Sequence, residues 1–254
     1  MENSVKMIFD IGMHEGDDTA YYLQNGYRVV AVEANPDLVR MSKRKFASHL
    51  DTGDLTVIDK CISTSDEFEM SFWINEDNSE WSSFDEQAAK KMNTRAHEIK
   101  IEAVTPDYLF EQYGVPYYLK IDIEESDIYV LEAIDANNKP QYISCEVGNP
   151  KLLDILQDKG YTKFKMINQA SGFNSYSYWE ERLYLPSLFR KICWKLRKIF
   201  FPNTIKYGDS GPFDEETSGI WKDYEAIKKD FLSYYPSEGK PINNLSWYDF
   251  HASY

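Results

Sequence analysis

The sequence contains few cysteines and comparatively little positive charge, and each shortage excludes a class of protein. Its three cysteines, Cys61, Cys145 and Cys193, are widely spaced and form no C-x-x-C pair, so neither a disulfide framework nor a cysteine zinc site is predicted. Lysine and arginine number 28 against 42 aspartates and glutamates, a formal net charge of −14. Because nucleic-acid binding needs a basic surface, we expect no nucleic-acid partner.

Long apolar runs are also missing. No stretch approaches the roughly 18 apolar residues of a membrane-spanning helix, and the N-terminus MENSVK lacks the apolar region of a secretion signal. We therefore expect a cytoplasmic protein. Hydrophobic residues nevertheless make up 43% of the chain and aromatic residues 15%, which is enough for a buried core and argues against disorder.

Strand-like and helix-like segments alternate from the N-terminus onward. The segments KMIFDIG, YRVVAVE and LTVIDKCIS are typical of buried strands. Helices are expected between them, one capped by Asp18 or Thr19 and ended by Gly26, the other running from Asp37 to about His49. This order predicts an α/β protein with a doubly wound, parallel sheet and helices on both faces.

The alternation continues to about residue 170 and then fades. The later segments predicted to form strands and helices are FEMSFWINE, IKIEAV, VPYYLKIDIEESDIYVLEAI, PQYISCEVGNPKLLDILQDKG and YTKFKMIN. The polar stretch 77–96 receives no assignment. We predict a ligand-binding core over residues 1–170 and a C-terminal extension over 171–254 that contributes to the substrate site, a lid or an interface.

A glycine turn follows the first strand. Asp10, Gly12 and Gly16 give the spacing D-x-G-x-x-x-G, at the carboxyl end of a strand, where doubly wound sheets bind ligands. The dinucleotide pattern G-x-G-x-x-G fails, because His14 and Asp17 occupy two of its glycine positions. The turn therefore argues against an NAD-linked oxidoreductase.

Acidic residues narrow the choice of ligand. Glu15, Asp17 and Asp18 follow the turn and would repel a pyrophosphate at the start of the helix. S-adenosylmethionine has no phosphate and carries a sulfonium cation and an ammonium group. Glu33 ends the second strand, where a carboxylate can accept hydrogen bonds from both ribose hydroxyls. These residues favour S-adenosylmethionine, and the alternative is a structural turn with surface acids.

Three segments carry a family resemblance. FDIGMHEGDDTAYYLQNGYRVVAVEANP, WSSF at 81–84 and YLKIDIEESDIYVLEAI at 118–134 resemble the FkbM family of S-adenosylmethionine-dependent methyltransferases, over roughly residues 7–170. SGPFDEETSGIW further on is similar to segments of some members. The resemblance implies the class I, Rossmann-like methyltransferase fold with a sheet of about seven strands. It also implies methyl transfer, mostly to hydroxyls of sugars or natural products.

The resemblance also implies a cofactor site. By position, Asp10, Gly12, Gly16 and Thr19 match the cofactor loop, and Glu33 matches the ribose acid. Further candidates for cofactor contact are His14, Asn35, Asp59 and Ile62.

A second group of candidates lies in the segment YYLKIDIEESD. Strand alternation places Lys120, Asp122 and Glu124 on one side. Because the sulfonium methyl is already activated, the enzyme mainly supplies alignment and a base for the acceptor's proton. Asp122 is the first candidate base, Glu124 the second, and Lys120 would hold the acid or lower its pKa. Alternatively, Asp122 only shapes the cofactor pocket.

One departure from the family pattern and one alternative concern this second group. Many family members have the sequence IDIEG, whereas this chain has Glu125 in place of the glycine. This replacement affects the local backbone and the substrate preference. The same carboxylates would also suit Mg²⁺, although the sequence does not require a metal.

The region beyond residue 170 has two notable segments. Residues 185–201 form a basic amphipathic pattern, with four interpretations: contact with a membrane surface, a lid, a homodimer contact or an ordinary surface helix. An aromatic cluster before it suits sugar rings or a core, and comprises Phe173, Tyr176, Tyr178, Trp179 and Tyr184.

The sequence therefore predicts an O-methyltransferase for a hydroxyl of a sugar, glycan or related small molecule. The alternatives are a non-catalytic module that binds an adenosyl ligand, favoured by Glu125, and an NAD-linked oxidoreductase.

Overall fold

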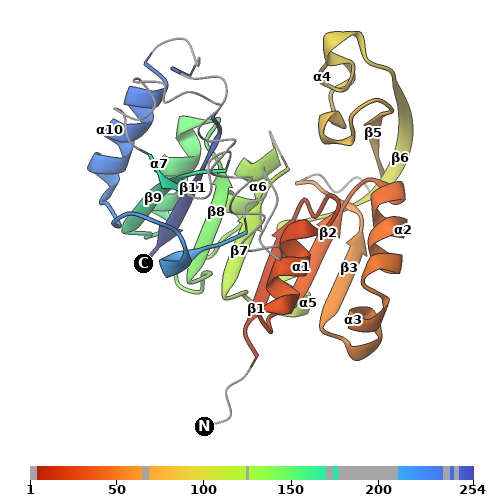
Figure 1. Ribbon diagram of the computed structural model, residues 1–254, viewed down its shortest axis with the longest axis horizontal. Coiled ribbons are helices and arrows are strands. Elements are labelled where there is room, and N and C mark those ends of the chain that lie inside the picture. Colours follow the sequence, from red (N-terminus) through yellow and green to blue (C-terminus); the bar gives the residue numbers. More distant parts are fainter. Residues whose placement is uncertain are drawn as a thin grey trace, which may run out of the picture. The chain divides into compact units, whose positions relative to one another are not determined.

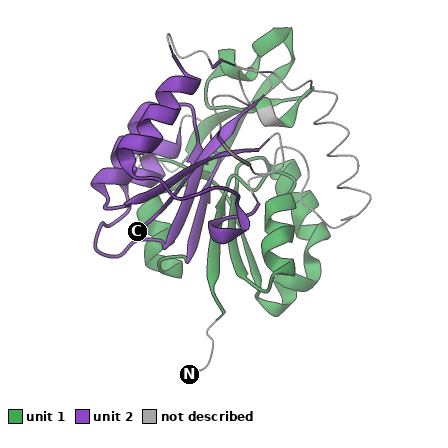
Figure 2. Cartoon of the chain, turned by 60° about the vertical axis from the view of Figure 1, so that its left-hand side comes forward, with its two compact units in different colours: residues 1–116 green, residues 117–254 purple. Residues whose placement is uncertain are grey.

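The computed structural model describes residues 5–64, 69–123, 126–169, 174–176, 211–236, 241–242 and 246–254. The chain divides into two compact units, residues 1–116 and residues 117–254, which Figure 2 shows in different colours. Each unit is described by itself below. Among the described helices, none is long and apolar enough to cross a membrane.

The first unit begins with three parallel strands. The strands β1 (Met7–Ile11), β2 (Arg28–Glu33) and β3 (Leu55–Asp59) lie next to one another in that order. Helix α1 (Asp17–Gln24) connects the first two strands, and α2 (Pro36–Lys45) with α3 (Ala47–Thr52) connects the next two (Figure 1). The predicted β-α-β-α-β order is therefore confirmed.

Helices cover both faces of β1. Phe9 points to one face, where its ring centroid lies 6.0 Å from that of Phe110 on α5 (Pro106–Tyr113). The next residue, Asp10, points to the other face and accepts a hydrogen bond from Thr19 of α1, because successive side chains of a strand alternate. Asp10 therefore faces α1, whereas Phe9 faces α5.

The single helix expected from Asp37 to His49 is interrupted at Phe46. This residue ends α2 and begins α3, with φ −113° and ψ 24°. Its side chain is buried and reaches the position where Gly16 would carry a Cβ. The inward ring explains the break, since Phe46 packs against the glycine turn and does not continue the surface helix.

The strand predicted over LTVIDKCIS is also two strands. β3 ends at Asp59 and pairs with β2, whereas β4 (Cys61–Ile62) pairs with β6 (Ala96–Val104). The third strand of this smaller sheet is β5 (Glu69–Asn75), antiparallel to β6. Its small core comprises Cys61, Phe72, Ile74 and Ile101.

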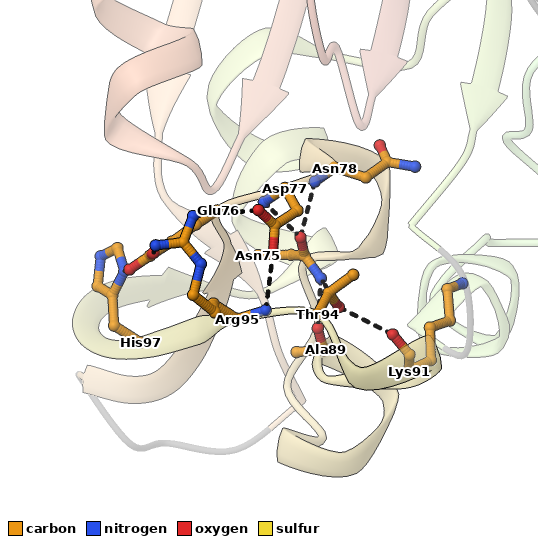
Figure 3. A network of polar contacts seen from close by, with 9 residues as sticks. All are labelled: Asn75, Glu76, Asp77, Asn78, Ala89, Lys91, Thr94, Arg95 and His97. Atoms are coloured by element: carbon orange, nitrogen blue, oxygen red, sulfur yellow. Dashed lines mark hydrogen bonds and ion pairs between the residues drawn. The ribbon is translucent and has the colours of Figure 1, made fainter.

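The connection between β5 and β6, residues 76–95, contains three short helical turns: η1 (Ser79–Trp81), α4 (Glu86–Ala89) and η2 (Lys91–Asn93). Figure 3 shows that Asn75 anchors it. The Asn75 Oδ1 accepts hydrogen bonds from the backbone N–H groups of Asp77 (2.8 Å) and Asn78 (2.7 Å). Its Nδ2 donates to Ala89 O and Thr94 Oγ1, both at 2.6 Å. One buried amide therefore ties both ends of the β5–β6 connection together.

The second unit contains a mixed sheet in the order β10-β9-β11-β8-β7. These strands are β7 (Tyr118–Ile121), β8 (Tyr142–Glu146), β9 (Lys163–Asn168), β10 (Asn174–Ser175) and β11 (Tyr248–Ser253). β7 and β8 are parallel, but β11 is antiparallel to both β8 and β9. The predicted parallel pairing is found for β7 and β8, and β11, which enters between β8 and β9 from the far end of the chain, makes the sheet mixed.

Three helices of the second unit pack near this sheet: α6 (Asp127–Glu132), α7 (Pro150–Asp158) and α10 (Tyr224–Tyr234). On one face Phe231 of α10 packs against Phe250, with ring centroids 5.7 Å apart. On the other face Phe213 stacks on Tyr118 at 4.0 Å, and the Lys165 ammonium lies 4.5 Å from the Trp221 ring centre. Residues 211–221, the described part of the SGPFDEETSGIW segment, thus cover this face.

Candidate functional site

The glycine turn after β1 folds back against the end of β2. The backbone N–H groups of Gly12 and Met13 both donate to Val32 O at 3.0 Å, and Gly16 N donates to Met13 O at 2.9 Å. Gly12 has φ 87° and Gly16 has φ 75°, conformations that glycine adopts without steric cost. The predicted spacing of the two glycines therefore corresponds to two left-handed residues in one tight turn.

Gly16 is further restricted by its surroundings. A Cβ at this position would lie 2.7 Å from Phe46 Cε2 and 2.9 Å from Met13 Cε. Only a residue without a side chain fits between the turn and the buried ring of Phe46.

Glu33 is the acid that the turn encloses. Its side chain is 8% exposed, and its two carboxylate oxygens are held by backbone N–H groups from opposite directions. Oε2 accepts from His14 N at 2.8 Å, and Oε1 accepts from Asn35 N at 2.7 Å. One backbone hydrogen bond to each oxygen therefore fixes the orientation of the Glu33 carboxylate.

Asp10 and Thr19 form a second buried contact beneath the turn. Thr19 Oγ1 donates to Asp10 Oδ2 at 2.6 Å, and both side chains are buried. The expectation that Asp18 or Thr19 caps α1 is wrong. The capping position belongs to Gly16, which offers no side chain, and Thr19 instead joins α1 to β1.

The acids after the turn differ in their surroundings. Asp17 forms an ion pair with Lys45 at 2.9 Å, and the same ammonium donates to the Glu15 carbonyl oxygen at 2.9 Å. Asp18 is buried in α1, and Glu15 is exposed. The Lys45 ammonium therefore offsets part of the negative charge at the turn's exit, and Asp18 is buried there, as Asp10 and Glu33 are beside the turn.

Three further predicted cofactor residues, Asn35, Asp59 and Ile62, belong to the first unit. Asn35 Oδ1 accepts from Asp37 N at 2.9 Å and caps α2. Asp59 is the register partner of Glu33 in the neighbouring strand, and its carboxylate lies 3.5 Å from Lys43 Nζ. Ile62 is buried in β4. Contact of these three side chains with a cofactor stays a prediction.

His14 connects the turn to a residue that sequence reasoning missed. Its φ is 49°, and its ring Nε2 lies 2.8 Å from Ser79 Oγ. Ser79 belongs to the polar stretch 77–96, where no periodicity marks structure. The only nearby signal is the segment WSSF, which begins two residues later.

The predicted catalytic residues belong to the second unit. Lys120, on β7, is buried, and its Nζ lies 3.5 Å from Asp122 Oδ2. Asp122 follows the end of β7 and is about half exposed, at 47% of its side chain. The structure therefore brings these two residues together. Glu124, with Glu125, lies outside the described residues.

Asp127 is a buried acid in the same segment. Its Oδ1 accepts a hydrogen bond from Ile123 N at 3.0 Å. Burial raises the pKa of Asp127 well above its usual range, and the nearby carboxylates of Asp122 and Glu146 act in the same direction. The chain segment after β7 is thus fixed by a carboxyl group that resists ionisation.

The described cysteines are poor nucleophiles. Burial raises the pKa of the Cys61 thiol to about 11 and also raises that of Cys145, so both remain protonated at neutral pH. Cys193 lies outside the described residues. Within the part of the chain that the structure describes, no group of three or more His, Cys, Asp or Glu residues is arranged to hold a metal ion.

Of the C-terminal aromatic cluster, the structure describes Tyr176. This residue is buried, and its ring packs against Tyr234 (5.8 Å) and Tyr248 (5.5 Å), which fits a role in the core. The remaining aromatic residues of the cluster and the amphipathic segment 185–201 lie outside the described residues.

Parallel strands, a left-handed glycine turn and a buried acid at the end of the second strand define a Rossmann-like fold of the class I methyltransferase type. The model of the methyltransferase FkbM domain matches residues 10–163. The chain therefore belongs to the FkbM family and is an S-adenosylmethionine-dependent methyltransferase. The resemblance stated from the sequence motifs is confirmed by this match.

The chain is also similar to solved methyltransferase structures. It is 11% identical to precorrin-6y C5,15-methyltransferase from Geobacter metallireducens GS-15, covering 99% of this chain and 82% of that one, with a TM-score of 0.42. It is 12% identical to phosphoethanolamine N-methyltransferase 2 from Haemonchus contortus, bound to S-adenosyl-L-methionine. That match covers 100% of this chain and 49% of that one, with a TM-score of 0.42. It is 13% identical to an S-adenosylmethionine-dependent methyltransferase from Archaeoglobus fulgidus, and that match covers 99% of this chain and 87% of that one, with a TM-score of 0.41.

These similarities are low, and the chain spans only about half of the Haemonchus enzyme. The family assignment rests on the domain match. No curated protein sequence matches the chain.

Proposed function

We propose that the chain transfers a methyl group from S-adenosylmethionine to a hydroxyl of a sugar, glycan or related small-molecule intermediate. The observation that carries the cofactor part is the carboxylate of Glu33, held by the backbone N–H groups of His14 and Asn35 at 2.8 and 2.7 Å. A carboxylate fixed by the loop itself is a suitable acceptor for a ribose diol.

The residues of the turn have separate roles in this proposal. Gly12 allows the backbone to approach the cofactor closely, because it carries no side chain, and Gly16 leaves room for the ring of Phe46 that packs against the turn. Asp10 and Thr19 hold α1 against β1 through their 2.6 Å hydrogen bond, and Glu33 accepts the ribose hydroxyls. The bound cofactor supplies an activated methyl group on a sulfonium.

Asp122 is proposed to take the proton of the acceptor hydroxyl. The Lys120 ammonium lies 3.5 Å from its Oδ2, and this ion pair would hold the carboxylate in position. About half of the Asp122 side chain is exposed, so an acceptor can reach it. A base at this position suits a hydroxyl acceptor, since a hydroxyl must lose its proton during transfer.

The cofactor proposal is tested by calorimetric titration. We expect the purified chain to bind S-adenosylmethionine and S-adenosylhomocysteine but not NAD, and we expect Glu33→Ala to weaken both affinities at least about tenfold, because it removes charge-assisted hydrogen bonds. Glu98→Ala is the matched control, since Glu98 lies on the smaller sheet beside Lys100. Binding of NAD alone, or equal affinities for Glu33→Ala and the unchanged chain, would contradict the proposal.

The acceptor proposal needs a separate experiment. Sugars and glycans are incubated with the enzyme and S-adenosylmethionine, and mass spectrometry follows the gain of one methyl group on oxygen. Transfer to nitrogen would replace the hydroxyl proposal. Cofactor binding without transfer to any acceptor would favour the alternative of a non-catalytic binding module.

A further inference from the structure

We propose that Ser79 is a positioning residue for the cofactor turn, and that through it the occupancy of the cofactor site is linked to the order of the β5–β6 connection. This inference rests on the proposed function, because it assumes that Glu33 binds the cofactor. All residues involved belong to the first unit.

Three successive hydrogen bonds carry the inference. Ser79 Oγ lies 2.8 Å from His14 Nε2, His14 N donates to Glu33 Oε2 at 2.8 Å, and Glu33 Oε1 accepts from Asn35 N at 2.7 Å. A residue of the β5–β6 connection is therefore joined to Glu33, the proposed ribose acid, through one histidine. The histidine uses its ring for one contact and its backbone for the other.

The backbone of His14 makes the ring contact consequential. Its φ of 49° lies in the left-handed region, which residues with a Cβ adopt rarely. Such a conformation persists only when surrounding contacts hold it. The ring contact with Ser79 holds one side of the residue, and the N–H bond to Glu33 holds the other. Without Ser79, His14 is expected to relax and to release the Glu33 carboxylate.

Ser79 itself stands on a fixed support. Asn78 N donates to Asn75 Oδ1 at 2.7 Å, as Figure 3 shows, and Trp81 N donates to Asn78 O at 3.1 Å. Ser82 N donates in turn to the Ser79 carbonyl at 3.2 Å. The hydroxyl of Ser79 is thus presented by a turn that the buried Asn75 anchors, and not by an isolated loop.

Linkage makes the effect reciprocal. If an ordered β5–β6 connection favours the turn that binds the cofactor, then a bound cofactor must favour an ordered connection by the same factor. The outer part of the connection includes Met92, which is 82% exposed and has φ 58°. Few buried contacts hold such a segment, so its backbone hydrogen exchange is a sensitive readout.

The first experiment compares cofactor affinity between serine variants. Ser79→Ala is expected to raise the Kd for S-adenosylhomocysteine by about 3- to 10-fold, the usual effect of losing one hydrogen bond. Ser79→Thr retains a hydroxyl and should restore affinity to within about twofold. Ser71→Ala is the matched control, because Ser71 lies on β5 of the same small sheet and accepts from the exposed Lys100.

A double-mutant cycle tests whether His14 transmits the effect. His14→Ala should also weaken binding, and Ser79→Ala should then cause no further change, since coupled residues are not additive. Additive losses in the double variant would overturn the proposed route through His14.

Hydrogen exchange tests the second half of the proposal. Saturating S-adenosylhomocysteine should slow exchange of the amides of residues 76–95 in the unchanged chain and in Ser71→Ala, and should slow it less in Ser79→Ala at equal saturation. Equal protection in Ser79→Ala would overturn the link.

The outcomes separate this inference from the proposed function. If Glu33→Ala weakens binding but Ser79→Ala binds as tightly as the unchanged chain, the positioning role is refuted while the cofactor site stands. If Glu33→Ala binds normally, the cofactor site is misplaced and this inference fails with it.

Discussion

Gly16 illustrates how much the site depends on single residues. Its φ is 75°, and the ring of Phe46 occupies the space that a side chain would need. The two constraints are independent, because one concerns the backbone and the other the packing of α2 and α3 against the turn. Phe46, between α2 and α3, therefore also requires glycine at position 16, although the sequence motif relates this position to cofactor binding alone.

The first prediction at this scale concerns Gly16→Ala. A left-handed alanine costs roughly 1 kcal/mol, and the contact of the new Cβ with Phe46 adds overpacking of about 1–3 kcal/mol. We expect a lower free energy of unfolding and weaker binding of S-adenosylmethionine, measured by denaturant unfolding and calorimetry.

Gly53→Ala provides the control for that prediction. Gly53 has φ 78°, and a Cβ there would meet no atom within 4 Å, so this variant reports the backbone cost alone. Equal destabilisation by the two substitutions would show that Phe46 yields to the new methyl group.

At the scale of elements, β11 is the least expected part of the fold. All six of its residues are buried, yet His251 and Asp249 among them are polar. His251 is the register partner of Ser144 on β8 and of Lys165 on β9, so a row of polar side chains crosses the centre of this sheet. Phe213 and Trp221 close over the face on which Lys165 lies.

His251 leads to a prediction about pH. Burial, together with the nearby Lys165 cation, lowers the pKa of His251 from 6.5 to about 3. In the unfolded chain histidine takes up a proton below about pH 6.5, whereas the folded chain does not. The contribution of His251 to stability is therefore full above pH 6.5 and is lost as the pH falls from 6.5 towards 3, by up to about 1.4 kcal/mol per pH unit.

The test compares the unchanged chain with His251→Asn, which keeps a neutral polar side chain. Denaturant unfolding at several pH values between 4 and 8 should give a smaller loss of stability on acidification for the variant. Parallel pH profiles would show that His251 does not remain neutral in the folded chain. His49→Asn serves as the control, because His49 lies on α3 with 41% of its side chain exposed.

Particular elements show why only part of this fold was predictable. The strands β1 and β2 and the helix between them carry local apolar periodicity, so the sequence is sufficient to place them, together with Asp10, Gly12, Gly16 and Glu33. The break at Lys60 separates β3 from β4, because β3 pairs with β2 and β4 pairs with β6. These two partner strands lie far apart in the chain. Local patterns contain no information about such pairings.

Two other features were hidden for different reasons. β11 alternates apolar and polar residues, but its place between β8 and β9 depends on pairing with strands that lie far earlier in the chain. Ser79 was missed because the β5–β6 connection is organised by the side chain of Asn75, and a single anchoring amide leaves no periodic signal. Both features arise from tertiary contacts between polar groups.

At the scale of the whole molecule, the proposed roles are divided between the two compact units. Residues proposed for cofactor binding belong to residues 1–116, whereas Lys120 and Asp122 belong to residues 117–254. The formal net charge of −14 also favours neutral or cationic small ligands over polyanions. Binding and chemistry are therefore expected to respond separately to substitution.

The prediction at this scale concerns Asp122→Asn. If Asp122 accepts the acceptor's proton, the variant should bind S-adenosylmethionine with unchanged affinity but show a kcat lower by about 10²- to 10⁴-fold, the usual contribution of a positioned base. Asp158→Asn, which alters an exposed acid at the end of α7, should leave both quantities unchanged. Full methyl transfer by Asp122→Asn would remove Asp122 from the mechanism.

The position of β11 has a consequence for synthesis of the protein in the cell. The ribosome makes Tyr248–Ser253 about a hundred residues after β8, and at 5–20 residues per second this interval lasts roughly 5–20 s. During that time β8 and β9 have exposed edges, which are sites for aggregation. Nascent chains of this protein are therefore expected to depend on chaperones until translation passes Ser253.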